Sequence, residues 1–214
     1  MGHVQNDMAA SVWFSVLLLY LRRAVALDPT NAGIVLFSGQ IFDGIATPLV
    51  GVGSDNSVCC PRYGLGRRKG WNLGGAILVT LCFSLIYMVC LRCAADVTPA
   101  VETLYYAVMA SLFNVGWAAV QVSHMSLVPE LAQHSQGQTL LNSARYAMTV
   151  IANVSVFCGL WGLLHWLPGA DTSTPDVYRY LAGGVITLGF GATLLFLILT
   201  PDPSTRWTGE RNTS

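Results

Sequence analysis

Residues 180–200 read YLAGGVITLGFGATLLFLILT, a run without Asp, Glu, Lys or Arg. A helix of this length extends about 30 Å, which matches the hydrocarbon thickness of a bilayer. The run is too long for a strand and lacks the alternation typical of a membrane barrel. Only a helix satisfies all of its own backbone groups in lipid, so the run predicts a transmembrane helix.

Five further stretches share this length and apolar character. With the first run, the predicted spans are about residues 2–21, 31–52, 70–91, 103–122, 145–167 and 180–200. They predict an all-α membrane protein whose six-helix bundle fills residues 1–206, with a short polar tail at 207–214.

Composition supports a membrane protein and argues against other classes. Hydrophobic residues make up 53% of the chain and charged residues only 10%, against about 25% charged in soluble domains. Net charge is zero, which gives no reason to expect a nucleic-acid partner. No hydrolase, zinc-protease or phosphate-loop motif occurs, so we expect neither an enzyme nor a cofactor. Cys90 and Cys93 lack an accompanying histidine cluster, so we expect no metal site.

The loop between the second and third spans carries a glycine, aspartate and arginine pattern. Gly51 precedes Asp55, and Arg67 and Arg68 follow where the third span begins. Asp55 stands at the carboxyl end of a helix, where the dipole disfavours an anion, so a nearby arginine is needed to offset its charge. Such a pair can latch two helices together. The alternative is an ordinary basic loop. Under either interpretation, the cluster of basic residues predicts that this loop and both termini are cytosolic.

Ionisable residues inside the spans are candidates for function. Asp43 stands near the middle of the second span, where an unpaired carboxylate costs at least about 2.5 kcal/mol, so it should face a cavity, cation, proton path or arginine. Asp7 in the first span is a candidate second carboxylate of the same site. Each can instead be structural, as an ion pair between helices or a residue at the membrane edge. His124 is a lesser candidate as a proton carrier.

Polar residues of three spans could contact a solute. Arg145 begins the fifth span beside Tyr146, and a guanidinium binds a carboxylate in a bidentate fork. The same side chain can equally extend to lipid headgroups. Gln121 lies in the fourth span, and Thr47 precedes Pro48, whose ring frees a backbone carbonyl. Either residue can simply hold helices together.

Several stretches, taken in chain order, resemble the major facilitator superfamily. They are Gly2-His3 with Asn6-Asp7, Trp13-Phe14, Gly39-Gln40 with Asp43-Gly44, the loop from Gly51 to Lys69, Gly116-Trp117 with Gln121, Ser126 to Leu131, and Ala144 to Ala147. Within that superfamily they are similar to carriers of lysosomal and melanosomal membranes, and more distantly to the glycoside-pentoside-hexuronide cation symporters. The resemblance covers nearly the whole chain.

The resemblance implies the N-terminal half of a twelve-helix secondary carrier, with the substrate path between two six-helix halves. It implies cysteine import into lysosomes and melanosomes with an influence on pigmentation; the plasma membrane is the alternative location. The distant symporters hold a cation with acidic residues and a sugar with an arginine. Asp7, Asp43 and Arg145 match that pattern, whereas Thr47 and Gln121 stand where carboxylates are expected. We therefore expect proton coupling or facilitated movement rather than sodium coupling.

Two alternatives stay open on the sequence alone. One is a cation-coupled sugar symporter, and the other is a scaffold or truncated isoform that transports nothing. The expected partners are the lipid bilayer, a small polar solute, a proton or sodium ion, and a C-terminal six-helix half or a second chain.

Overall fold

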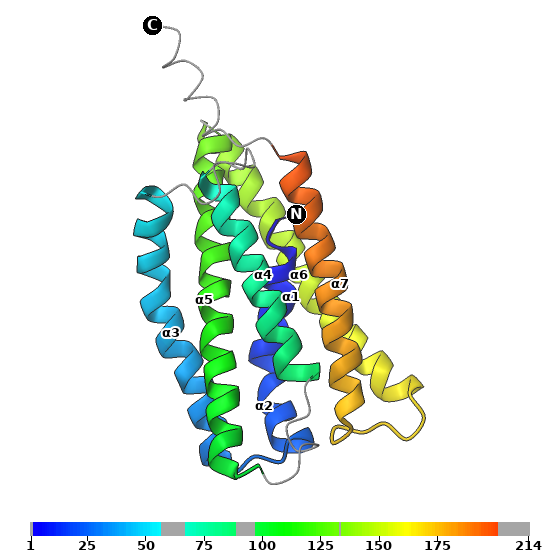
Figure 1. Cartoon of the computed structure of the whole chain (residues 1–214). Helices are drawn as coiled ribbons and strands as arrows, with labels where there is room; N and C mark the ends of the chain where they lie inside the picture. The colour runs from blue at the N-terminus through cyan, green and yellow to red at the C-terminus, as the bar shows by residue number, and fades with distance from the viewer. Residues whose placement is uncertain (1, 57–66, 89–96, 133, 201–214) are drawn as a thin grey trace, which may run out of the picture.

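The computed structural model describes residues 2–56, 67–88, 97–132 and 134–200, and for residues 67, 130 and 131 only the backbone. The described residues form helices and connecting turns, with no strand among them. Figure 1 shows long helices lying side by side in one bundle. The predicted tail at 207–214, most of the loop before Arg67, and Cys90 with Cys93 lie outside the described residues.

The first span is broken. Helix α1 (Val4–Ser15) is followed by the short α2 (Leu17–Leu19) and the π-helical turn η1 (Tyr20–Ala24), with a bend of 45° between the two parts. In η1 the Val25 N–H donates to the Tyr20 carbonyl 3.0 Å away, five residues back. This wider turn changes the hydrogen-bond ladder at the span's end, where the sequence had predicted regular helix to about residue 21.

Long helices make up the rest of the described chain. They are α3 (Pro29–Asn56), α4 (Arg67–Met88), α5 (Pro99–Leu131), α6 (Ser135–Trp166) and α7 (Pro175–Leu199). Three of them begin at a proline. Proline is tolerated at the first position because an N–H there would have no acceptor within the helix. Among the described residues, these five helices are long and apolar enough to cross a membrane, and the bent pair makes a sixth if it counts as one span.

Helices α5 and α6 extend beyond the spans predicted from apolarity. Serine hydroxyls allow this in α5, because Ser123 donates to the Ala119 carbonyl at 2.6 Å and Ser126 to the Val122 carbonyl at 2.7 Å. A hydroxyl that bonds back to its own helix needs no water. In the same way, the Thr139 hydroxyl donates to the Ser135 carbonyl at 2.9 Å in the first turns of α6.

Helix α5 is the centre of one side of the bundle, with α3 and α4 packed against it, while α1 packs against α6 and α7. Glycines allow α4 and α5 to cross closely. A Cβ added at Gly75 would lie 2.8 Å from the Gly116 carbonyl oxygen, and one at Gly116 would lie 3.0 Å from the Val79 nitrogen. Small residues at helix crossings are a common way to bring membrane helices together.

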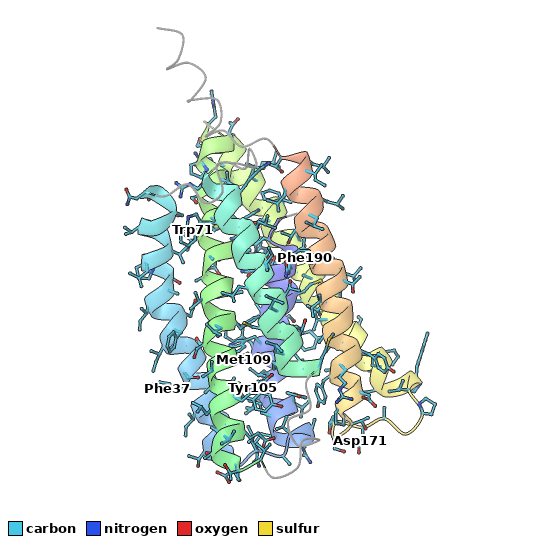
Figure 2. All side chains as sticks on the ribbon, viewed as in Figure 1. Phe37, Trp71, Tyr105, Met109, Asp171 and Phe190 are labelled. Atoms are coloured by element: carbon cyan, nitrogen blue, oxygen red, sulfur yellow. The ribbon has the colours of Figure 1, made fainter. Side chains whose placement is uncertain are left out.

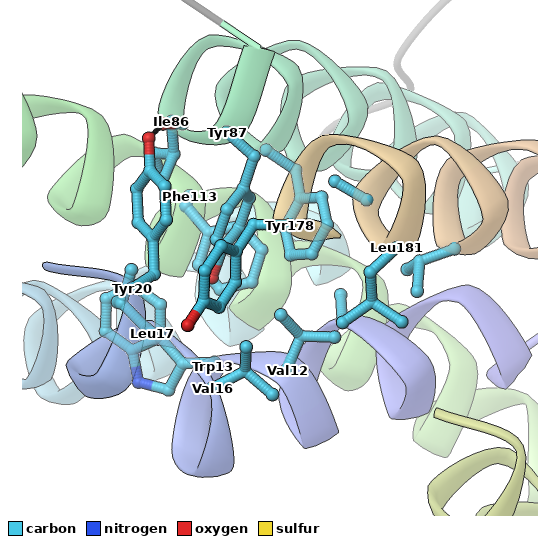
Figure 3. Packing of buried hydrophobic residues seen from close by; sticks show 14 of the residues in the cluster. Val12, Trp13, Val16, Leu17, Tyr20, Ile86, Tyr87, Phe113, Tyr178 and Leu181 are labelled. Carbon is cyan, nitrogen blue, oxygen red and sulfur yellow. Dashed lines mark hydrogen bonds between the residues drawn. The ribbon is translucent and has the colours of Figure 1, made fainter. Parts of the chain in front are cut away.

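Aromatic rings fill the core between α1, α4, α5 and α7. Figure 3 shows Trp13, Tyr20, Tyr87, Phe113 and Tyr178 packed together. The outer faces of α3 and α6 are apolar but uncovered. Phe37, for example, is 68% exposed on α3 and points away from the other helices in Figure 2.

Buried polar groups tie distant helices to each other. Gln5 of α1 donates to Thr80 of α4 at 2.7 Å and accepts from Thr193 of α7 at 3.1 Å. Lys69, buried at the start of α4, donates to the Leu197 carbonyl at 2.8 Å. A cation at that place satisfies a carbonyl in the last turn of α7, which has no helical partner of its own.

Candidate functional site

A cavity of about 420 Å³ opens where the start of α1, the end of α5, the start of α6 and the end of α7 meet. That volume falls within the range of about 300–1,000 Å³ usual for small-molecule sites. The wall is largely apolar. Its lining residues are His3, Val4, His124, Leu127, Val128, Leu141, Ala144, Arg145, Met148, Phe196, Leu199 and Thr200.

Asp7 lies behind this wall and holds His3 in place. His3 Nδ1 lies 2.7 Å from Asp7 Oδ1, and the Thr149 hydroxyl of α6 donates to Asp7 Oδ2 at 3.0 Å. Both carboxylate oxygens therefore have a partner, and both His3 and Asp7 are buried. The spacing of four residues places His3 and Asp7 on one face of the first helical turn. An anion in that turn is also favoured by the helix dipole.

Three nitrogen atoms of cavity-lining side chains have no hydrogen-bond partner among the described residues. They are Nε2 of His3, Nδ1 of His124 and Nε of Arg145, and all three are buried. The His3 and His124 rings lie 5.2 Å apart between centroids. A buried polar atom left without a partner costs about 1–3 kcal/mol, so an occupant that supplied polar atoms here would remove that cost.

Asp43 and Thr47 lie in a different environment on α3. The Thr47 hydroxyl lies 3.4 Å from Asp43 Oδ1, one turn along the same helix. Asp43 is half-buried and Thr47 exposed, and neither lines the cavity. The structure thus brings Asp7 close to Thr149 of α6, while Asp43 has its described hydrogen bond within α3. A joint site for the two carboxylates stays a prediction.

Gln121 and Tyr146 lie outside the cavity wall. Gln121 is half-buried on α5, three residues before His124. Tyr146 is 68% exposed, because successive residues of a helix turn by about 100° and Arg145 takes the inward direction. Their predicted contacts with a solute are untested by this arrangement.

The predicted latch joins α3 to α4. Arg68 Nη1 lies 2.7 Å from Asp55 Oδ1 and donates to the Ser54 hydroxyl at 3.3 Å. Gly51 stands one turn earlier, with open space where a side chain would be, and the Arg67 side chain lies outside the described residues. The ion pair is present, and its role as a latch stays a prediction.

Two residues of the cavity region were absent from the predicted site. His3 was recognisable from its spacing, since His3 and Asp7 are four residues apart near the start of a helix. Thr149 gave no comparable signal, because its partner Asp7 lies 142 positions away in the sequence. Within the described ranges, no group of three or more His, Cys, Asp or Glu side chains could hold a metal ion.

Comparison with known proteins places this arrangement in a family. A family model described as "MFS/sugar transport protein" matches residues 1–213. Major facilitator superfamily domain-containing protein 12 of Homo sapiens is 40% identical over an alignment of 210 residues that covers 91% of this chain and 43% of the relative. The Mus musculus protein of the same name is 37% identical, over 99% of this chain and 47% of the relative.

A more distant relative is an uncharacterised symporter of Synechocystis sp., 31% identical over 70% of this chain and 27% of its own length. The chain thus spans less than half the length of these relatives. The family match covers all of the described helices and agrees with their all-helical architecture. This chain, a multi-pass membrane protein, belongs to the MFS/sugar transport protein family of secondary transporters.

Proposed function

We propose that this chain supplies the N-terminal six helices of a secondary transporter that imports cysteine into lysosomes and melanosomes. Support for a small polar solute comes from Arg145, a cation whose Nε has no described partner in the wall of an otherwise apolar cavity. Support for cysteine and for the organelles comes from the resemblance of the sequence to carriers of those membranes. The relatives, about twice as long as this chain, support the proposal that a second half completes the path.

Cysteine suits the chemistry of the cavity. Its carboxylate matches a guanidinium, which offers donors in a planar fork. Its small, weakly polar side chain can lie against the apolar residues Leu127, Met148 and Phe196. Arg145 is therefore the residue whose loss should impair uptake most.

The test is uptake of radiolabelled cysteine into lysosomes that carry the full-length protein. Removing a charged hydrogen bond costs about 1.5–3 kcal/mol, so Arg145→Ala should lower uptake about ten- to hundredfold. The matched control is Arg179→Ala. Arg179 Nη1 lies 2.8 Å from Asp176 Oδ1, and neither residue lines the cavity. Undiminished uptake by Arg145→Ala would contradict the proposal, as would complete inactivity of the unaltered protein toward cysteine.

A cation-coupled sugar symporter is the second candidate, favoured by the family description and by the symporter among the relatives. Asp43 with Thr47 is the carboxylate available to a cation in that case. Asp43→Asn should then abolish sodium stimulation of sugar uptake. If Asp43→Asn instead retains cysteine uptake that does not depend on sodium, the result favours the cysteine transporter.

A further inference from the structure

We propose that His3, held by Asp7, takes up the proton that enters the cavity together with the carboxylate of the solute. The inference rests on the proposed function and names the group that couples the two. It assigns Asp7 a positioning role behind His3 rather than direct contact with the solute. Four observations carry it.

The first observation is the direction of the His3 hydrogen bond. A carboxylate accepts, so Nδ1 of neutral His3 donates to Asp7 Oδ1 across the 2.7 Å contact. The second nitrogen, Nε2, then carries a bare lone pair. This Nε2 atom has no described hydrogen-bond partner, and the ring lines the cavity. Neutral His3 can therefore accept a hydrogen bond there, but it has no proton to donate to an anion.

The second observation is the charge of the surrounding groups. The titratable or charged side chains near His3 are Asp7 of α1, His124 of α5 and Arg145 of α6, while α7 contributes Phe196, Leu199 and Thr200. A protonated His3 and Arg145 would be two positive charges in the wall of one cavity. A carboxylate bound beside both would offset their charges. Proton and carboxylate should therefore bind cooperatively, each raising the affinity for the other by the same factor.

The proposed step balances, which is the third point in its favour. A proton from solution binds the Nε2 lone pair, the Nδ1 proton stays on its hydrogen bond to Asp7, and no covalent bond of the solute changes. Negative Asp7, positive His3, the carboxylate and positive Arg145 would then alternate in sign. Release of the carboxylate leaves the two positive charges without it and returns the proton to solution.

The fourth observation separates the two histidines. His124 contacts the rings of His3 and Phe196, with centroids 5.2 Å and 5.3 Å apart, and has no carboxylate among its described contacts. Of the two histidines, only His3 has a described carboxylate partner, Asp7 at 2.7 Å. His124 therefore serves as the matched control for His3.

The experiment measures binding of L-cysteine and of acetate, a bare carboxylate, to the full-length protein in lipid nanodiscs between about pH 5 and pH 8. Linkage to one proton predicts that affinity rises as pH falls, by about tenfold per pH unit on the alkaline side of the titration. His3→Gln should remove this pH dependence, whereas His124→Gln should retain it. Calorimetry in buffers of different ionisation enthalpy should show about one proton bound with each carboxylate at the alkaline end, a readout that needs no variant.

Several outcomes would overturn the inference: pH-independent binding by the unaltered protein, an unchanged slope in His3→Gln, or no binding of either probe. Its failure is distinguishable from failure of the proposed function. Cysteine uptake without proton linkage overturns the role of His3 and leaves the transporter in place. Proton-linked acetate binding without cysteine uptake supports the role of His3 and removes cysteine as the solute.

Discussion

The two ends of the bundle treat their buried polar groups differently. At the tyrosine end, defined by Tyr20, Tyr87, Tyr106 and Tyr178, two hydroxyls have backbone partners: Tyr20 donates to the Ile86 carbonyl at 3.0 Å and Tyr178 to the Thr172 carbonyl at 2.7 Å. The rings also pack on one another, with Tyr20 and Tyr87 centroids 4.9 Å apart. This end is filled by its own side chains.

At the cavity end, defined by His3, His124 and Arg145, each side chain keeps a buried nitrogen without a described partner. Apolar side chains surround these nitrogens and cannot satisfy them. The difference supports the proposal that the polar side chains of the cavity end face an occupant, whereas the tyrosine rings serve packing. Substitutions can test the two ends separately.

The largest effect is expected where a substitution disturbs both ends at once. Gly75→Val forces a side chain against the α5 backbone at the Gly116 carbonyl and the Val120 nitrogen. Overpacking of this kind costs about 1–3 kcal/mol or more, and backbone atoms cannot move aside as a side chain would. We expect a large fall in the thermal midpoint in detergent. Gly74→Val is the control, because open space surrounds that position, and equal melting of both variants would contradict the close crossing.

A substitution that fills the cavity should weaken solute binding at the cavity end without lowering stability. Ala144→Phe places a ring in the cavity, so L-cysteine binding should weaken about tenfold or more, which corresponds to about 1.4 kcal/mol. Apolar walls can accept the ring, so the thermal midpoint should change little. The comparison variant is Ala147→Phe, which lies on the exposed side of α6 outside the cavity wall. Unaltered binding by Ala144→Phe would place the site elsewhere.

Removing one hydroxyl at the tyrosine end should have the converse effect. Tyr20→Phe leaves the Ile86 carbonyl without this donor and should lower the free energy of unfolding by about 1 kcal/mol, with solute binding unchanged. Tyr146→Phe, on an exposed face of α6, should leave stability unchanged. A loss of binding without a loss of stability in Tyr20→Phe would erase the distinction between the ends.

The smallest effect is expected in the turn beside Tyr178. The side-chain hydrogen bond from Ser173 lowers the pKa of Asp171, aided by the Ser173 amide and the Thr174 hydroxyl. Because the pKa of Asp171 is lowered, the ionised carboxylate stabilises this turn at every pH above the ordinary pKa of an aspartate. The stabilisation is lost as the pH falls through the lowered pKa. The protection factor of the Ser173 amide, which is its exchange rate corrected for the intrinsic effect of pH, should therefore be retained at about pH 5 and fall only at lower pH. Asp171→Ala should abolish this protection, and Asp176→Ala should not.

Features that depend on local pattern could be predicted from the sequence. Apolar length predicted membrane-spanning helices, because lipid allows few other structures. The pairing of Asp55 with an arginine of the next helix followed from the charge of a helix end and is present as the Asp55–Arg68 ion pair. Both inferences need only residues close together in the chain.

Features that depend on contacts between distant segments could not be predicted. The hydrogen bond from Thr149 to Asp7 joins α6 to α1, and no periodicity in either segment indicates it. The cavity likewise depends on how four helix ends diverge. The break after Ser15 lies in an apolar stretch without proline or glycine, so composition gave no warning of it.

Arg68 and Lys69 connect the start of α4 to two other helices. Arg68 forms an ion pair with Asp55 of α3, and Lys69 donates to the Leu197 carbonyl of α7, close to Leu199 and Thr200 in the cavity wall. Adjacent residues of one rigid helical turn thus hold two helices on opposite flanks. If the Asp55–Arg68 pair acts as the predicted latch, a tilt of α3 would move the start of α4 and, through Lys69, the end of α7 that lines the cavity, although no residue of α3 lines it.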